Sequence, residues 1–205
     1  MIADHEPVLR YAGVADVDAL AALHAERIGE GFLVTLGPAF LRRLYARIVR
    51  SPRAFVLVAG ATRSVEPGTH PVDGFVAVAD DTRALYREFV LHDGLRAGLA
   101  AAPGILCAPR AVLETLRYGF AAGDGADGAE ILATAVARDA AGRGIGTRLV
   151  RAAVEELQRR GARTAHVVTA AGNEAAVRAY RHGGFRESGH REVHRGVAQQ
   201  LLVWP

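Results

Sequence analysis

Apolar and polar positions alternate along the chain in two kinds of pattern, and these patterns predict its secondary structure. Short runs rich in apolar and β-branched residues are typical of strands. Longer segments with an apolar position every three or four residues are typical of amphipathic helices. The predicted strands are 8–13, 54–60, 73–80, 130–136, 164–170, 184–189 and 198–204, and the predicted helices are 16–28, 38–51, 144–161 and 173–184.

The segment 82–128, between the third and fourth predicted strands, indicates a helical insertion. Its apolar positions have helical spacing, and we expect a first break at Pro103 and a second at the GDGADG turn. The apolar positions before the proline are Leu85, Phe89, Leu95 and Leu99. The chain is thus one α/β (α+β) domain, 1–205, in which a mixed central sheet is flanked by helices and interrupted by this insertion.

The composition is that of a folded globular protein, with 50% hydrophobic and 23% charged residues in 205. The single cysteine, Cys107, cannot form a disulfide within the chain and offers no metal cluster, so we expect a reducing compartment and no metal. The start MIADHEPVLR has no basic and apolar leader, and no apolar run reaches membrane-spanning length. We therefore predict a cytoplasmic protein with no membrane partner.

The charge balance disfavours nucleic acid as a partner. All 25 basic residues are arginines, the net charge is only +3, and the arginines are scattered among acidic residues. Without lysine, a phosphate group must be bound by guanidinium groups or backbone amides. An anionic ligand therefore fits the chain better than a polynucleotide.

A glycine-rich turn precedes the helix 144–161 and is the first candidate binding site. Gly142, Gly144 and Gly146 let backbone amides approach a ligand, and the free N–H groups of the first helical turn are donors for a pyrophosphate. A Walker loop is disfavoured because Gly-Lys-Ser/Thr is absent, and a dinucleotide fingerprint because its last glycine is replaced by Thr147. A glycine-rich turn without a ligand remains the structural alternative, and Arg143 adds positive charge in either case.

Two segments together resemble the GNAT superfamily of acyl-CoA-dependent N-acyltransferases. They are VARDAAGRGIGTRL and NEAAVRAYRHGGF, within positions 130–188. The family usually has Gln or Arg where this chain has Ala141, so that side-chain contribution is missing. The resemblance implies a mostly antiparallel sheet of about seven strands, with the strands 130–136 and 164–170 splayed around acetyl-CoA. It also implies cofactor-binding residues Ala135, Val136, Ala137, Gly142, Arg143, Gly144, Ile145, Gly146, Thr147, Asn173 and Tyr180.

By the same resemblance, Tyr180 is the expected general acid that protonates the departing thiolate, and Glu130 is the expected base that deprotonates the amine. Proton transfer from Tyr180 to the thiolate costs little, because a phenol and a thiol have similar pKa values. The alternatives are a core aromatic for Tyr180 and an exposed carboxylate for Glu130. His24, Glu26 and Glu30 lie where the family binds its acceptor. The apolar surroundings of Cys107 favour packing over an acyl-enzyme, so direct attack in a ternary complex is expected.

The function predicted from these residues is acetyl transfer from acetyl-CoA to a small-molecule primary amine, such as an amino sugar or an aminoglycoside-like compound. Two alternatives stay open: acetylation of a protein N-terminus or lysine, and a non-catalytic CoA-binding sensor or structural module. The insertion 82–128 is suited to form a lid, to shape the acceptor pocket or to build a homodimer interface.

Overall fold

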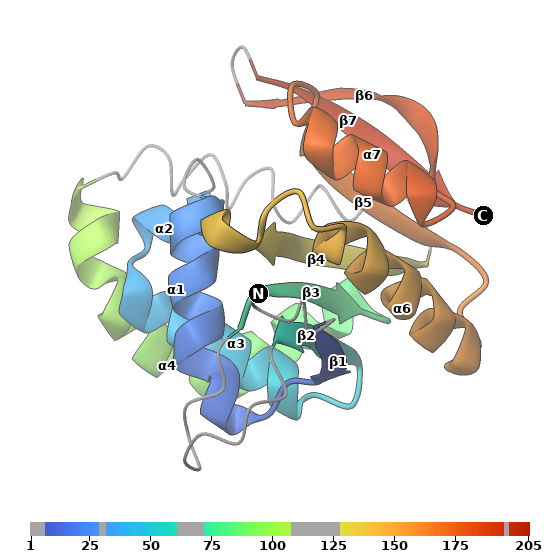
Figure 1. Ribbon diagram of the computed structural model, residues 1–205. Helices are drawn as coiled ribbons and strands as arrows, with labels where there is room; N and C mark the ends of the chain where they lie inside the picture. The colour runs from blue at the N-terminus through green and yellow to red at the C-terminus, as the bar shows by residue number, and fades with distance from the viewer. Residues whose placement is uncertain (1–6, 29–31, 61–71, 108–127, 195–196) are drawn as a thin grey trace.

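Seven strands form one sheet, as predicted. The computed structural model describes residues 7–28, 32–60, 72–107, 128–194 and 197–205 (Figure 1). The strand order is β1-β2-β3-β4-β5-β7-β6, and only the β4–β5 pair is parallel. The strands are β1 (Val8–Tyr11), β2 (Ala54–Gly60), β3 (Gly74–Ala79), β4 (Ala129–Val136), β5 (Ala165–Ala170), β6 (Arg186–His194) and β7 (Val197–Trp204).

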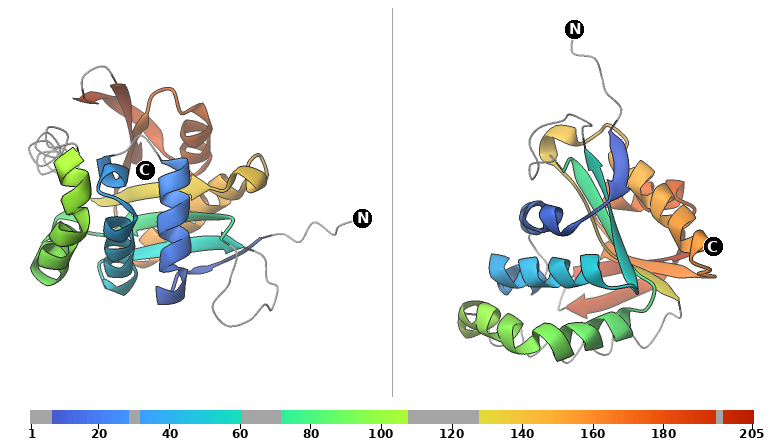
Figure 2. Two further views of the ribbon diagram at one scale, coloured as in Figure 1. Left: turned by 90° about the vertical axis from the view of Figure 1, so that its left-hand side faces the viewer. Right: turned by 90° about the horizontal axis from the view of Figure 1, so that it is seen from below.

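Helices cover both faces of the sheet. One face carries α1, α3 and α4, and α6 lies on the other, which Figure 2 shows clearly in its right-hand view. The helices are α1 (Val17–Arg27), α2 (Phe32–Thr35), α3 (Pro38–Arg50), α4 (Thr82–Cys107), α6 (Ile145–Arg159) and α7 (Glu174–His182), with 3-10 turns at Val14–Asp16 and Arg138–Ala140. The short helix α2 occupies a stretch that the sequence indicated as loop.

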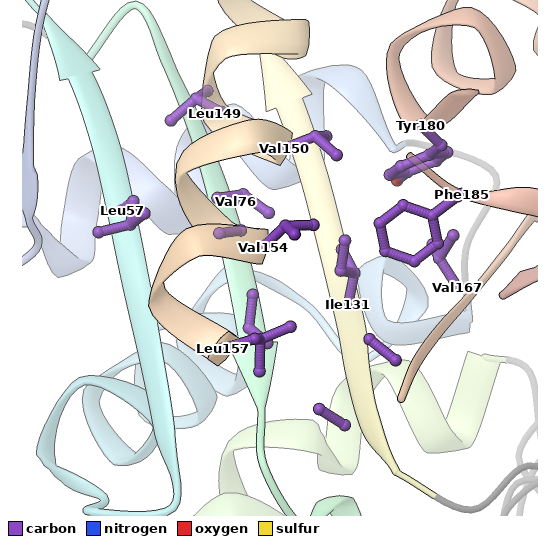
Figure 3. Close-up of a cluster of buried hydrophobic side chains, with 14 of the residues drawn as sticks. Leu57, Val76, Ile131, Leu149, Val150, Val154, Leu157, Val167, Tyr180 and Phe185 are labelled. Atoms are coloured by element: carbon purple, nitrogen blue, oxygen red, sulfur yellow. The ribbon is translucent and has the colours of Figure 1, made fainter. Parts of the chain in front are cut away.

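Side chains of alternate residues on the central strands fill two hydrophobic clusters. Phe55, Leu57, Val76 and Val78 face α6, and their neighbours on the same strands face α1, α3 and α4. Every residue of β3 is buried, because helices cover the sheet on both sides. Figure 3 shows the first cluster, in which α6 and the C-terminal Tyr180 and Phe185 pack over β4.

The start of α1 differs from the expected cap. Asp16 was predicted to begin the helix, but it makes no side-chain cap to α1. Its carboxylate instead accepts hydrogen bonds from both terminal nitrogens of Arg10, each at 2.7 Å, and from the Gly13 N–H at 2.7 Å. A bidentate guanidinium pair is a stronger interaction than a neutral cap, so Asp16 ties the end of β1 to the start of α1.

Helix α4 is longer and less buried than the pattern predicted. It continues to Cys107, so the predicted break at Pro103 is wrong. A proline removes one backbone donor from a helix but does not always end it. Leu85 and Phe89 are buried as expected, whereas Leu95 and Leu99 are 82% and 70% exposed. The buried face continues instead through alanines, and residues 108–127 of the predicted insertion lie outside the described part of the chain.

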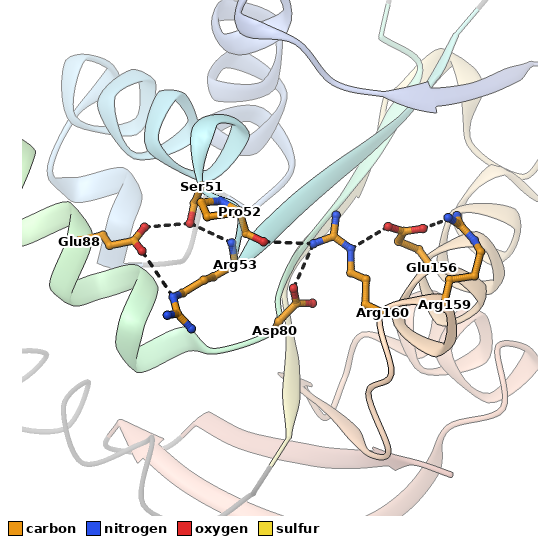
Figure 4. Close-up of polar contacts among 8 residues, drawn as sticks. All are labelled: Ser51, Pro52, Arg53, Asp80, Glu88, Glu156, Arg159 and Arg160. Carbon is orange, nitrogen blue, oxygen red and sulfur yellow. Dashed lines mark hydrogen bonds and ion pairs between the residues drawn. The ribbon is translucent and has the colours of Figure 1, made fainter.

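Charged groups are densely paired where α6 ends (Figure 4). Arg160 donates from Nε to Glu156 at 2.7 Å and from Nη1 to Asp80 at 3.0 Å. The same guanidinium lies 4.5 Å from the centre of the Phe55 ring. Glu156 is only 4% exposed and also pairs with Arg159. This network joins the end of α6 to the ends of β2 and β3.

Candidate active site

Strands β4 and β5 part after a short paired stretch. They are paired only through Ala129 with Ala165 and Glu130 with His166. Beyond these two pairs β4 continues to Val136 beside β3, and β5 continues to Ala170 beside β7. The register of β4 against β3 also shifts between Ala77 and Val78, which marks a bulge in the middle of β4. The splay that the resemblance implied is therefore present.

The glycine turn leads into α6 next to the end of β4 that has parted from β5. Gly142 and Gly144 have φ values of +78° and +74°, in the left-handed region that favours glycine. A Cβ at either position would meet nothing within 4 Å. Their conformation leaves open space over the turn, which fits a ligand that approaches the backbone closely.

Backbone donors of this turn face that space without partners in the described chain. The first hydrogen bond of α6 runs from the Arg148 N–H to the Gly144 carbonyl at 3.1 Å. No hydrogen bond within the described ranges is donated by the N–H groups of residues 142–147. Ile145, which is 1% exposed, packs into the core and anchors the helix start. A fixed group of free N–H donors at a helix N-terminus suits the diphosphate of coenzyme A.

A cavity of about 370 Å³ joins the glycine turn, the open end of β4 and α7. Two predicted cofactor residues do not line it. Arg143 is exposed outside the cavity, and the Ala137 N–H is used in a 2.8 Å hydrogen bond to the Asp73 carbonyl. The predicted residues that do line it are Ala135, Val136, Gly142, Gly144, Ile145, Gly146, Thr147, Asn173 and Tyr180.

Helix α7 brings Asn173 and Tyr180 to the cavity from the C-terminal half of the chain. Asn173 caps the helix, as its position suggested, because its side-chain oxygen accepts from the Ala176 N–H at 3.1 Å. Its side-chain amide still has N–H donors for a ligand. Tyr180 lies about two turns further on and is 4% exposed, with Phe185 in edge-to-face contact at 5.8 Å between ring centres.

The environment of the Tyr180 hydroxyl keeps it protonated. Burial raises the pKa of Tyr180 above its usual value, and Thr134 of β4 lowers it by a smaller amount. A neutral phenol with a raised pKa holds its proton until a strongly basic group accepts it. Tyr180 is therefore both a core aromatic and a chemically suitable proton donor beside the cavity.

Glu130 lies on the other side of the sheet from Tyr180. Its neighbours Ala129 and Ile131 belong to the cluster under α6, so Glu130 points toward the layer of α1, α3 and α4. Its side chain is 28% exposed, and Glu130 Oε2 lies 3.9 Å from His166 Nε2. Tyr86 of α4 is also close, and burial together with the charge of Glu130 raises the pKa of Tyr86 to about 12, although the residue is 37% exposed.

Of the three predicted acceptor residues, two are described and neither is free. His24 is 4% exposed, its Nδ1 is hydrogen-bonded to the Tyr45 hydroxyl at 2.7 Å, and burial lowers the pKa of His24 to about 4. A neutral, enclosed imidazole favours a packing role over contact with an acceptor. Glu26 is half exposed and forms an ion pair with Arg138 at 3.3 Å. Glu30 lies outside the described residues.

Four polar residues of the cavity were not found from the sequence, and two of them, Arg178 and His182, lie on α7. Arg27, the last residue of α1, lines the same cavity as the glycine turn and adds positive charge there. Thr134 lines it from β4. Arg27 lies 115 positions before Gly142 in the sequence, and Thr134 sits in an otherwise apolar strand. Only the alternation of β4, which sets Thr134 on the same side as Val136, offered a signal for it.

In the described part of the chain, no group of three or more histidine, cysteine, aspartate and glutamate side chains is arranged to hold a metal ion. None of the helices in those ranges is both long enough and apolar enough to cross a membrane.

Comparison with known proteins decides the family. The profile of the acetyltransferase (GNAT) family matches residues 79–185, which contain β4, the glycine turn, α6 and α7. The chain belongs to the GNAT family of acetyltransferases. This GNAT protein is therefore an acyl-CoA N-acyltransferase, as the two sequence segments indicated. No curated protein matches it by sequence.

Solved GNAT structures share the fold over nearly the whole chain. The putative acetyltransferase yncA from Salmonella typhimurium, solved with its cofactor acetyl-CoA, is 16% identical with a TM-score of 0.58, over 97% of this chain and 93% of that one. The ribosomal-protein-alanine N-acetyltransferase from Brucella melitensis is 20% identical with a TM-score of 0.58, over 96% and 98%. AAC(6')-Ib, in complex with paromomycin and acetyl-CoA, is 16% identical with a TM-score of 0.55, over 98% and 93%.

Proposed function

We propose that this GNAT protein transfers an acetyl group from acetyl-CoA to the primary amine of a small molecule, with an amino sugar or an aminoglycoside-like compound as the first acceptor class to test. One observation carries the proposal. The free donors of the glycine turn and the protonated Tyr180 line a single cavity beside the parted strands β4 and β5. Such a cavity has a binding end for a diphosphate and a reacting end with a proton donor.

The residues present fit coenzyme A as a ligand. Backbone N–H groups of residues 142–147 would bind the diphosphate, and the guanidinium of Arg27 would add an opposite charge. The missing side chain at Ala141 is compensated by these groups. Ala135 and Val136 border the parted side of β4, where the pantetheine arm would lie, and Asn173 would donate from its amide.

Acetyl-CoA supplies an activated thioester, and the chain supplies the proton transfers. Glu130 takes a proton from the ammonium form of the acceptor, which frees the nitrogen lone pair. A carbon–nitrogen bond to the acetyl carbonyl forms and the carbon–sulfur bond breaks. Tyr180 gives its proton to the departing sulfur, and the second amine proton leaves to solvent. The products are the acetamide and free coenzyme A.

The opposite placement of Tyr180 and Glu130 supports direct attack in a ternary complex. Tyr180 belongs to the cluster on the face of the sheet that α6 covers. Glu130 lies on the opposite face, which α1, α3 and α4 cover. β4 and β5 part just beyond the pair of Glu130 with His166. In the proposed complex the thioester lies where the strands part, and the amine approaches it from the side of Glu130. No covalent acetyl-enzyme is needed in this arrangement.

A protein N-terminus or lysine is the second candidate acceptor. The similar solved structures include a ribosomal-protein-alanine N-acetyltransferase and a NatC complex bound to Gag peptide and CoA, as well as the paromomycin complex. Their TM-scores are similar, so the shared fold supports both acceptor classes equally. The cytoplasmic location stays a prediction.

The test is release of coenzyme A thiol from acetyl-CoA with a panel of amino sugars, aminoglycosides, polyamines, amino acids and peptides. We expect turnover with an amino sugar or aminoglycoside, a fall in kcat of about 100-fold in Tyr180→Phe, and a fall in kcat/KM in Glu130→Gln. Turnover with peptides alone would replace the small-molecule acceptor by a protein. Tight acetyl-CoA binding without turnover on any acceptor would overturn the proposal.

A further inference from the structure

Thr134 is a hydroxyl-bearing residue in a strand whose other members are mostly apolar. It lies on the parted half of β4, on the same side as Val136, which packs against the cluster that contains Tyr180. Thr134 and Tyr180 both line the cavity. Two hydroxyl-bearing residues, one from β4 and one from α7, therefore line one cavity where the strands separate.

The Thr134 hydroxyl oxygen is buried and makes no well-formed hydrogen bond among the described residues. Leaving a buried polar group unpaired destabilises the folded state. Valine has almost the same shape and would fill this strand position without that cost. An unpaired buried hydroxyl on a residue that lines the cavity therefore points to a role when the cavity is filled.

We propose that Thr134 is a positioning residue for acetyl transfer, which donates its hydroxyl proton to the Tyr180 oxygen and leaves the Tyr180 proton directed at the departing sulfur of coenzyme A. This inference rests on the proposed function, since it assumes Tyr180 as the general acid. As Tyr180 gives up its proton, negative charge grows on the phenol oxygen. The Thr134 hydroxyl then stabilises that charge through a hydrogen bond.

The direction in which Thr134 shifts the pKa of Tyr180 in the free enzyme agrees with this proposal. Burial raises the pKa of Tyr180, and Thr134 opposes the rise. A hydrogen-bond donor to the phenol oxygen has this effect because it stabilises the phenolate. In the structure the Thr134 hydroxyl makes no hydrogen bond of good geometry among the described residues. Catalytic hydrogen bonds are often loose before the substrate binds.

A double-mutant cycle on the acetylation reaction tests the proposal. Thr134→Val should lower kcat about tenfold with the KM for acetyl-CoA unchanged, and Thr134→Ser should restore most of the rate. In a Tyr180→Phe background, Thr134→Val should cause no further loss, because Thr134 acts only through the phenol. If kcat of the double variant falls by the product of the two single losses, Thr134 acts independently of Tyr180. That result would overturn the inference.

The stability of Thr134→Val distinguishes a positioning role of Thr134 from a structural one. Removing an unpaired buried hydroxyl should leave Thr134→Val at least as stable as the wild type in urea unfolding. A variant that is slower but no less stable supports the proposal. A loss of stability that accounts for the loss of rate, with no rescue by serine, contradicts it.

A titration of bound coenzyme A needs no acceptor and covers the case in which the panel gives no turnover. The ultraviolet absorbance of the thiolate is followed against pH for free coenzyme A bound to each variant. Tyr180→Phe should raise the pKa of the bound thiol, Thr134→Val should raise it less, and the double variant should match Tyr180→Phe.

The outcomes distinguish the two proposals. An unchanged thiol pKa and kcat in Tyr180→Phe would remove Tyr180 from the proposed function. An effect of Tyr180→Phe with none of Thr134→Val would leave the proposed function in place and remove only the role of Thr134.

Discussion

The two ends of α6 are built in opposite ways, and the contrast separates binding from stability. At its N-terminal end, beside two left-handed glycines, the backbone N–H groups have no partner among the residues that the structure describes. At its C-terminal end the side chains of Glu156 and Arg160 are paired with each other and with the ends of neighbouring strands. We call the first of these, residues 142–147, the open end of α6, because its N–H groups are available to a ligand. We call the second, residues 156–160, the closed end, because its charged groups are paired within the chain.

The difference follows from what each end must do. Free donors at a helix start are satisfied by water or by a ligand, so they contribute to binding and little to folding. The carboxylate of Glu156 is almost completely buried, so most of its hydrogen bonds and charge pairing must come from within the protein. Substitutions at the two ends should therefore separate cleanly into effects on affinity and effects on stability.

The largest expected effect is at the closed end. Arg160→Ala should lower the free energy of unfolding by about 3 kcal/mol, because it leaves Glu156 buried with a weaker partner and removes the contact with Asp80. Acetyl-CoA affinity of the folded protein should not change. Urea unfolding and calorimetric binding measure the two quantities.

Arg159→Ala is the matched control, since Arg159 binds the same carboxylate but is 69% exposed. It should cost much less stability than Arg160→Ala, because ion pairs of exposed side chains contribute little. Equal losses in Arg159→Ala and Arg160→Ala would show that burial does not decide the strength of these pairs.

The next effect compares two glycines of the same geometry at the two ends. Gly144 and Gly161 have φ values of +74° and +81°, and a Cβ at either would meet nothing within 4 Å. Alanine at each should cost about 1 to 2 kcal/mol in stability. Only Gly144→Ala should also weaken acetyl-CoA binding, by about 30-fold, because its Cβ occupies the space over the turn. Equal affinity in both variants would place the ligand elsewhere.

Much of this fold could be predicted because the signals were local. All seven strands and the four long amphipathic or capped helices have alternation or spacing that the sequence displays directly. Helix α4 was harder, because alanines rather than leucines form much of its buried face, with Leu95 and Leu99 exposed. Apolar periodicity identifies a helix but not which apolar face finds a partner.

The site could be predicted only where its residues are close in sequence. The glycine turn and the Asn173–Tyr180 helix are continuous segments, and the structure brings both to one cavity. Arg27 reaches that cavity only through the packing of α1, and the burial of His24 beside Tyr45 depends on the packing of α1 against α3. Such long-range placements leave no pattern in one sequence.

A smaller effect separates two arginines near the open end. Arg27 lines the cavity, whereas Arg143, which the sequence favoured, is exposed beside it. Arg27→Ala should raise the Kd for acetyl-CoA about fivefold, and more at low ionic strength, while Arg143→Ala changes it less than twofold. A larger effect of Arg143 would restore the sequence-based interpretation. Binding at two salt concentrations provides the measurement.

The smallest effect is the acid response of the closed end. Burial favours the neutral form of Glu156, but hydrogen bonds from Tyr11 and Arg160 and the charges of Arg160 and Arg159 outweigh it and lower the Glu156 pKa. These opposing causes leave a modest net effect. Because the folded pKa is below that of the unfolded chain, the contribution is present above the usual glutamate value, about 4.3, and is lost as the pH falls through the folded value.

Urea unfolding of the wild type and Glu156→Gln across this acid range measures that contribution. His24, whose pKa is lowered to about 4, also costs stability as the pH falls below about 6.5, but it does so equally in both proteins. The difference between the two proteins therefore reports Glu156 alone. We expect the wild type to lose more stability than Glu156→Gln, and affinity for acetyl-CoA to be the same in both at neutral pH. A wild type that loses less would mean that burial, rather than pairing with Arg160, dominates at this end of α6.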